Sequence, residues 1–141
     1  MADPTESCIF CKIVAGEVPS SRVLEDETCL AFLDIGPLAP GHLLVIPKTH
    51  AMHLWDLDDQ TVAAIGAQLP RLARAVTEAT GAEGCNILQN NGRASGQVVE
   101  HVHFHIIPRR AEDGLGYRWV PGTYGPGQMA ACQKEIRGKL Q

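Results

Sequence analysis

The sequence predicts an α+β fold, in which one long helix packs on a face of a five-stranded antiparallel sheet. Short segments with strand character are joined by connections of only a few residues, as in antiparallel hairpins. One long segment between the strands has a helical period instead. Runs of strands with a single long helix between them are typical of α+β proteins.

The N-terminal part predicts one helical turn followed by three strands. Residues 8–14 form the turn, and residues 16–21, which combine glycine, proline and serine, form a loop. The strands are rich in branched apolar residues and are bounded by turn residues; they are expected at residues 22–25, 28–33 and 41–46.

Residues 58–80 predict a long amphipathic helix. Its apolar side chains recur at helical spacing on one face: Val62, Ile65, Leu69, Leu72, Ala73 and Val76. Asp58 can cap the start and Gly81 the end. Pro70 lies inside this run and lacks an amide proton, which predicts a kink there or two abutting helices.

The C-terminal part predicts two more strands, a loop-like tail and a last helix. The strands are expected at residues 84–89 and 98–107, with a loop at 90–96 between them. Residues 114–127 combine glycine, proline and aromatic residues without a period, and residues 128–140 predict a helix. No linker or shift in composition divides the chain, so we expect a single domain over residues 1–141.

Composition narrows the classes of partner. The 141 residues include 12 Lys and Arg against 16 Asp and Glu, a formal net charge of -4, and no basic run. Duplex nucleic acid and anionic membranes bind clustered Lys and Arg, so we expect neither and favour small molecules. No basic segment precedes an apolar run, and no stretch approaches the roughly 20 apolar residues of a membrane span. These features predict a cytoplasmic protein.

Three of the six histidines alternate with apolar residues at positions 101, 103 and 105. In a strand this spacing puts the three imidazoles on one face, with Val102, Phe104 and Ile106 on the other. A single histidine there is most often an ordinary half-solvated residue, but three in strict alternation indicate a site. Neighbouring imidazoles would start about 7 Å apart, so one straight strand could hardly bring all three to one metal. At least one has another task.

A metal is indicated by Cys8 and Cys11, whose C-x-x-C spacing lets two thiolates reach one cation. His50 and His101 are the best candidates to complete a tetrahedron. A closed site of this kind is structural, because it leaves no position open for water. The alternatives are two buried free thiols or a redox pair, although a redox pair is typical of a βαβ setting that this chain lacks. The other thiols are assigned to the core or surface: Cys29, Cys85 and Cys132.

His103 is then available for chemistry. A neutral imidazole is a competent nucleophile towards phosphorus, provided that a partner on Nδ1 leaves Nε2 unprotonated. His105, one step along the same face, can bind phosphoryl oxygens or assist the leaving group. The preceding loop, residues 90–97, supplies backbone amides, two glycines and carboxamides that can bind developing negative charge. Arg109 and Arg110 also follow the strand, but paired arginines there are more often a solvated edge.

The motif His-φ-His-φ-His-φ-φ, with φ apolar, resembles that of the histidine triad nucleotide-binding proteins. The resemblance covers nearly the whole chain, because further blocks follow in the family's order. These blocks are Cys8-Ile9-Phe10-Cys11-Lys12-Ile13, Ala31-Phe32-Leu33-Asp34-Ile35, Pro40-Gly41-His42, Val45-Ile46-Pro47-Lys48-Thr49-His50 and Gly96-Gln97.

The resemblance implies a homodimer whose sheets join into one continuous sheet, and a purine nucleotide as substrate. It implies a nucleotide site that comprises Ile9, Phe10, Phe32, Leu33, Asp34, Ile35, Asn90, Gly96, Gln97, His103 and His105. Asp34 would bind the ribose hydroxyls, and His103 would accept the nucleoside monophosphate group. Zinc ligands matching the bacterial branch would be Cys8, Cys11, His50 and His101.

One position departs from the family pattern. Many relatives carry a hydroxyl residue three positions before the triad, where this chain has Val98, which cannot donate to a leaving group. The aromatic tail with Trp119 and Tyr124 lies where relatives vary.

Together with the resemblance, these observations predict a zinc-stabilised nucleotidyl hydrolase that acts on purine nucleotides, with nucleoside phosphoramidates as the favoured substrates. The alternatives are hydrolysis or phosphorolysis of dinucleoside polyphosphates, a hydrolase that uses a metal-bound water, and a nucleotide-binding signalling module with little turnover.

Overall fold

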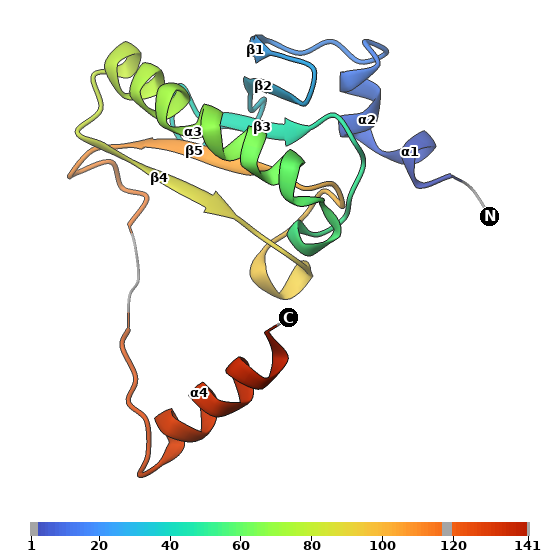
Figure 1. The fold of residues 1–141 in the computed structure, drawn as a ribbon. Helices are drawn as coiled ribbons and strands as arrows, with labels where there is room; N and C mark the ends of the chain where they lie inside the picture. Colours follow the sequence, from blue (N-terminus) through green and yellow to red (C-terminus); the bar gives the residue numbers. More distant parts are fainter. Residues whose placement is uncertain (1–2, 117–119, 141) are drawn as a thin grey trace.

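The computed structural model describes residues 3–116 and 120–140, and it shows one antiparallel sheet of five strands in the order β1-β2-β3-β5-β4. Its elements are the helices α1 (Pro4–Ser7), α2 (Ile9–Val14), α3 (Asp59–Thr80) and α4 (Gln128–Lys139), the strands β1 (Arg22–Glu25), β2 (Cys29–Leu33), β3 (Leu43–Pro47), β4 (Gly84–Gln89) and β5 (Phe104–Arg109), and the short 3-10 helices η1 (Leu54–Asp56) and η2 (Arg93–Ser95). The predicted α+β class is confirmed (Figure 1).

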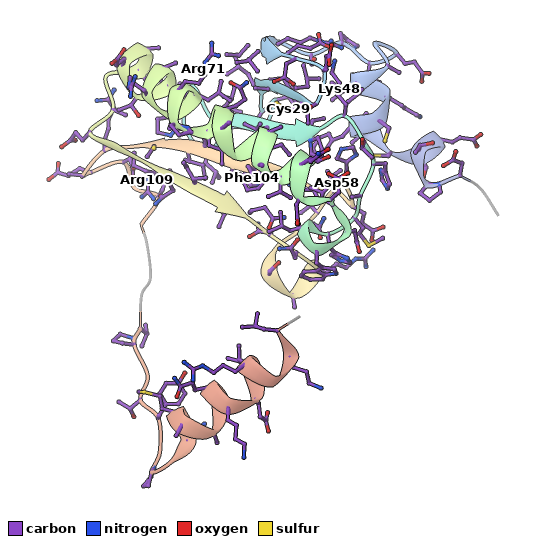
Figure 2. All side chains as sticks on the ribbon, viewed as in Figure 1. Cys29, Lys48, Asp58, Arg71, Phe104 and Arg109 are labelled. Atoms are coloured by element: carbon purple, nitrogen blue, oxygen red, sulfur yellow. The ribbon has the colours of Figure 1, made fainter. Side chains whose placement is uncertain are left out.

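The core has two layers because β2 and β3 are buried on both faces. One set of alternating side chains packs against α3: Cys29, Ala31, Leu43 and Val45, with Ile65, Leu72 and Val76 of the helix. The other set packs against α2: Leu30, Phe32, Leu44 and Ile46, with Phe10 and Ile13 of the helix. Cys29 and Phe104 lie between α3 and the sheet, whereas Arg71 is on the exposed side of the helix (Figure 2).

Helix α3 is a single element with the predicted ends. The carboxylate of Asp58 accepts from the backbone N–H of Thr61 at 2.7 Å, and Gly81 ends the helix in the left-handed region. The alternative of two abutting helices is wrong, because Pro70 lies inside one continuous helix. In a helix the carbonyl of Gly66 would accept from the N–H of residue 70, which proline lacks. Gly66 and Pro70 are both exposed, so water can reach this carbonyl instead.

The histidine-bearing strand begins later than predicted. β5 starts at Phe104, so His101 and His103 precede the strand and only His105 belongs to it. Pro47, near the end of β3, has no N–H, and its carbonyl accepts from the His101 side chain at 2.9 Å. The imidazole of His101 thus bonds the carbonyl oxygen of Pro47, which would otherwise be available for a longer pairing of β3 with β5. Neither of these imidazoles is an ordinary half-solvated side chain, because His101 is 0% and His103 5% exposed.

The helix predicted at residues 128–140 is present as α4, whereas the N-terminus holds a helix that the sequence did not predict. Helix α1 was not predicted, although Asp3 accepts from the N–H of Thr5 and Pro4 occupies the first helical position. At the other end α4 stands apart from the sheet, and none of its residues is buried (Figure 1). Trp119 lies outside the described residues. Within the described part of the chain, no helix combines the length and apolarity needed to cross a membrane.

Candidate active site and metal centre

A cavity of about 530 Å³ opens beside α2, between the ends of β2 and β3 and the residues that precede β5. It brings together most of the residues predicted to contact a nucleotide, namely Ile9, Phe10, Phe32, Leu33, Asp34, Ile35, Gly96, His103 and His105. Its wall is mainly apolar, with one carboxylate and two imidazoles at one side, as expected of a site for a small molecule with a polar end.

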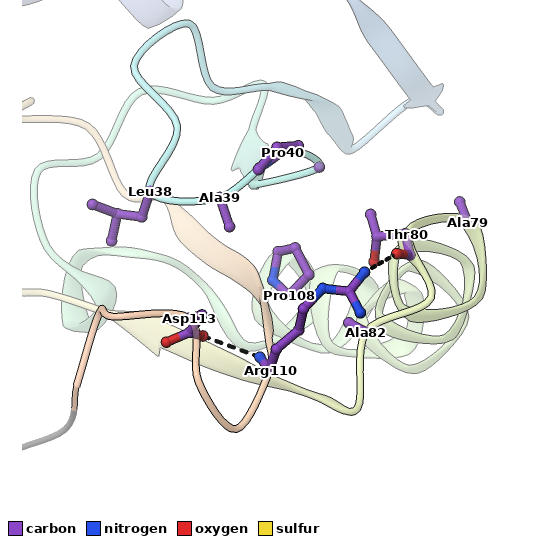
Figure 3. A pocket seen from close by; sticks show the side chains of 10 residues that line it. Leu38, Ala39, Pro40, Ala79, Thr80, Ala82, Pro108, Arg110 and Asp113 are labelled. Carbon is purple, nitrogen blue, oxygen red and sulfur yellow. Dashed lines mark hydrogen bonds between the residues drawn. The ribbon is translucent and has the colours of Figure 1, made fainter.

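A second cavity of about 490 Å³ lies at the C-terminal end of α3 (Figure 3). Its charged groups are already engaged there. Arg110 donates to the carbonyls of Thr80 and Gly81, while the carboxylate of Asp113 accepts from the backbone N–H of Arg110. No imidazole or thiol lines this cavity, so we assign the chemistry to the cavity that contains His103 and His105.

His103 is oriented by a single strong contact. Its Nδ1 lies 2.7 Å from the carbonyl oxygen of His101, and an oxygen there can only accept. Nδ1 therefore carries the proton, and Nε2 is left with a lone pair. The ring of Phe10 packs edge-on against that of His103, with centroids 5.2 Å apart. The structure thus places a hydrogen-bond acceptor beside Nδ1 of His103, as the sequence analysis requires of this residue.

His105 lies closer to His103 than strand spacing alone predicts. The two ring centroids are 4.9 Å apart, since the backbone before Phe104 is not extended strand and the rings turn towards each other. Burial, together with His103 and His42, lowers the pKa of His105 to about 4, so this imidazole is neutral at pH 7.

The loop before the triad is braced by Gln97, which is 4% exposed. Its carboxamide oxygen accepts from the N–H of Gly92 at 2.7 Å, and its nitrogen donates to the carbonyls of Met52 and Val99 at 2.7 and 3.1 Å. A direct contact of this side chain with phosphate would require breaking one of these bonds. Neither Gln97 nor Asn90 lines the cavity, so their predicted contacts with phosphate stay predictions.

The predicted metal ligands meet at one point. Sγ of Cys8 and of Cys11, and Nδ1 of His50 and of His101, all lie within 4.8 Å of one another. The separations are 3.3 Å for Cys8 and His101, 3.3 Å for Cys11 and His50, and 3.2 Å for the two imidazoles. Tetrahedral zinc with bonds of about 2.0 to 2.3 Å holds neighbouring ligand atoms about 3.3 to 3.8 Å apart. The residues fit the ion.

The protonation states also suit a metal. Because Nε2 of His101 donates to the carbonyl of Pro47, its Nδ1 faces the other ligands with a lone pair. Burial lowers the pKa of His101 to about 4, which keeps this ring neutral. Burial and the neighbouring Cys8 raise the pKa of the Cys11 thiol to about 12, so a thiolate here needs a cation beside it.

Comparison with known proteins decides the family. Residues 15–112 match the HIT domain, which covers more than half of the chain. The protein belongs to the HIT family.

Relatives and solved structures match this HIT-family chain over almost its full length. Adenosine 5'-monophosphoramidase hnt1 of Schizosaccharomyces pombe is 48% identical over 136 residues, which cover 96% of this chain and 99% of that protein. The crystal structure of a HIT family member from Bacillus subtilis superposes with a TM-score of 0.91 at 42% identity, and it covers 96% of this chain and 98% of that one. A zinc-bound histidine triad protein from Mycobacterium smegmatis has a TM-score of 0.75 at 42% identity, over 96% and 99% of the two chains.

Sequence reasoning on this HIT chain missed His42 as a functional residue. It is 3% exposed, and its Nε2 lies 2.8 Å from Nδ1 of His105. A lone histidine before a strand has no periodic signal. Only the pairing of Leu44 with His105 across β3 and β5, which brings positions 42 and 105 to diagonal places on one face, reveals it.

Proposed function

We propose that this HIT-family hydrolase cleaves purine nucleoside phosphoramidates through a covalent nucleotidyl intermediate on His103. The observation that carries the proposal is the 2.7 Å contact between Nδ1 of His103 and the carbonyl of His101, inside the cavity. It leaves Nε2 of His103 with a lone pair, so the attack needs no neighbouring base.

The reaction takes two displacements at phosphorus. In the first, Nε2 of His103 attacks the phosphorus, a nitrogen–phosphorus bond forms, and the amine departs with the electron pair of the broken bond and takes up a proton. In the second, water attacks the same phosphorus and loses a proton to the solvent, the bond to His103 breaks, the imidazole recovers its lone pair, and a nucleoside monophosphate is released. The neutral imidazole of His105, whose ring centroid lies 4.9 Å from that of His103, can bond the phosphoryl oxygens in both steps.

The apolar part of the cavity suits a purine base. Phe10 and Phe32 meet edge to face, with centroids 5.7 Å apart, and Ile9 and Leu33 extend the same wall. Asp34 lies at the rim of this wall. One of its carboxylate oxygens accepts from the N–H of Gly36 at 2.8 Å, and the remaining lone pairs are free to accept from two ribose hydroxyls. Asp34 thus orients the sugar between the base wall and the triad.

The amine leaving group is favoured by two observations. Val98 is 88% exposed at the cavity and offers no hydroxyl to a leaving oxygen, whereas a departing amine is basic enough to take a proton from water or an imidazole. The relative from S. pombe is named an adenosine 5'-monophosphoramidase. We therefore place phosphoramidates ahead of dinucleoside polyphosphates.

Zinc would be held by Cys8, Cys11, His50 and His101 in a structural role. When bound, it supplies four metal–ligand bonds that tie α2 to the segment before β5, with no position left for a reacting water. The chemistry is then done by the chain's own imidazoles.

The decisive experiment searches for the intermediate. A reaction with adenosine phosphoramidate labelled at phosphorus, quenched in the first turnover, should leave the label on a peptide that contains His103, and His103→Ala should carry none. Hydrolysis that survives in His103→Ala would refute the mechanism. Neither label nor turnover in the wild type would favour a nucleotide-binding module. Parallel turnover of a diadenosine polyphosphate decides the substrate class, because a higher kcat/KM for it would overturn the preference for phosphoramidates.

A further inference from the structure

His42 is held in a defined tautomer by its surroundings. The backbone N–H of Leu38 points at Nδ1 of His42, at 3.1 Å, and this N–H can only donate. Nδ1 must therefore accept, which leaves the single proton of the neutral ring on Nε2. Burial lowers the pKa of His42, in agreement with a neutral ring at pH 7.

That proton is directed at His105. Nε2 of His42 lies 2.8 Å from Nδ1 of His105 and 3.6 Å from the nearer carboxylate oxygen of Asp34. Only the first distance is a hydrogen bond. Nδ1 of His105 consequently accepts, and the proton of the neutral His105 ring is on Nε2, the ring nitrogen that is not engaged with His42.

The rings of His103 and His105 are thus held in opposite tautomers. Nδ1 of His103 meets a carbonyl, an obligatory acceptor, whereas Nδ1 of His105 meets an N–H, an obligatory donor. His103 therefore has a lone pair on Nε2, and His105 has an N–H there. A nucleophile and a hydrogen-bond donor lie with ring centroids 4.9 Å apart, although they are the same residue type.

We propose that His42 is a positioning residue that fixes the tautomer of His105, so that His105 presents an N–H to the transferred phosphoryl group beside the lone pair of His103. The role in phosphoryl binding rests on the proposed function, whereas the tautomer itself does not.

The same groups have a competing use as a metal site. The donor atoms of Asp34, His42 and His105 all lie within 4.8 Å of one another, close enough to share a cation. To ligate through Nε2, His42 would have to move its proton to Nδ1, where the N–H of Leu38 already points. The hydrogen bonding therefore favours a proton between His42 and His105 over a metal.

The first test reads the tautomer directly in the substrate-free, zinc-loaded full chain. Long-range ¹H–¹⁵N NMR correlations distinguish a protonated from an unprotonated ring nitrogen, and loss of signals in His105→Gln assigns the ring. We expect Nδ1 of His105 without a proton and Nε2 with one. A protonated Nδ1 on neutral His105 would overturn the proposal, and this result stands whether or not any substrate is turned over.

The second test uses a graded pair of variants. In His42→Gln the carboxamide can still accept from Leu38 and donate to His105, so the tautomer signature should persist and kcat should stay within about threefold of wild type. In His42→Leu the signature should become that of exchanging tautomers, and kcat should fall by about 10- to 100-fold with KM little changed, because a donor to the phosphoryl oxygens is lost in part of the molecules.

The control is His53→Leu, which removes a histidine that stacks on Trp55 away from the cavity and should leave kcat and the His105 signature unchanged. An unchanged signature and kcat in His42→Leu would refute the positioning role, and if that variant fails to fold, the wild-type spectrum and His42→Gln decide alone. A second equivalent of bound zinc that disappears in His42→Gln would instead support the metal reading and overturn the proposal.

Discussion

At the scale of single residues, the buried imidazole of His105 makes stability depend on pH. Burial, His103 and His42 lower its pKa to about 4 from the ordinary 6.5. Between these values the unfolded chain binds more protons than the folded one. The stability that this group contributes is therefore present above about pH 6.5 and is lost as pH falls towards 4.

We expect the wild type to lose about 1 kcal/mol or more of unfolding free energy over this range beyond what His105→Gln loses. One pKa unit corresponds to about 1.4 kcal/mol, and partial solvent access reduces the effect. Urea denaturation of both zinc-loaded proteins at several pH values measures it, with the metal site common to both. Identical pH dependence in the two proteins would show that His105 is not perturbed as described.

Residue types and spacing predicted most of the side chains that the structure brings together in the cavity and the metal centre, but not how they are held. The C-x-x-C pair and the alternating histidines indicated a metal and a nucleophile from local sequence alone. The contacts of His42 and Gln97 were not predicted, because their partners are distant in the sequence. His105 is 63 positions from His42, and Met52 is 45 positions from Gln97. Contacts of that range depend on strand register and loop path, which no short pattern encodes.

At the scale of elements, the turn into β3 depends on one glycine. Gly41 has a φ of +97°, and a Cβ there would lie 2.6 Å from Cγ2 of Thr80 at the end of α3. We expect Gly41→Ala to destabilise the protein by about 2 kcal/mol or more, because it combines backbone strain with a clash. Gly66→Ala is the matched control. This substitution lies in open space within a helix, and it should raise stability by about 0.5 to 1 kcal/mol. Thermal unfolding compares the two, and equal effects would contradict the steric argument.

The element that sequence patterns placed least well is β5. Alternation predicted strand from residue 98, yet the ladder begins at Phe104. The N–H of Val102 donates to the carbonyl of Ala51 at 2.8 Å, outside any strand, and His101 occupies the carbonyl of Pro47. Residues 101–103 are all buried because both sides of this segment are covered, so alternation in the sequence does not by itself distinguish a ladder strand from a segment held by other hydrogen bonds.

At the scale of the whole molecule, the four candidate zinc ligands come from the start of α2, the segment after β3 and the segment before β5. If zinc is structural, chelation should lower Tm by roughly 10 °C or more, and added zinc should restore it. Below the lowered Tm the metal-free protein should keep part of its hydrolytic activity, because Nε2 of His103 needs no metal. Scanning calorimetry with metal analysis and parallel rate measurements make the test. Complete loss of activity in a still-folded, metal-free protein would favour the metal-bound water mechanism instead.

The exposed edge of the sheet bears on assembly. β4 is an edge strand with Ile87 and Leu88 48% and 44% exposed, and an apolar edge with unpaired backbone groups is a template for another strand. We propose that two copies join there into one continuous sheet.

Ile87→Lys should then convert a dimer to a monomer in light scattering after size exclusion. Val23→Lys, at a 53% exposed position on β1 at the opposite edge, should leave the dimer intact. A dimer that survives Ile87→Lys and is lost in Val23→Lys would move the interface to the other edge, and a monomeric wild type would remove it altogether.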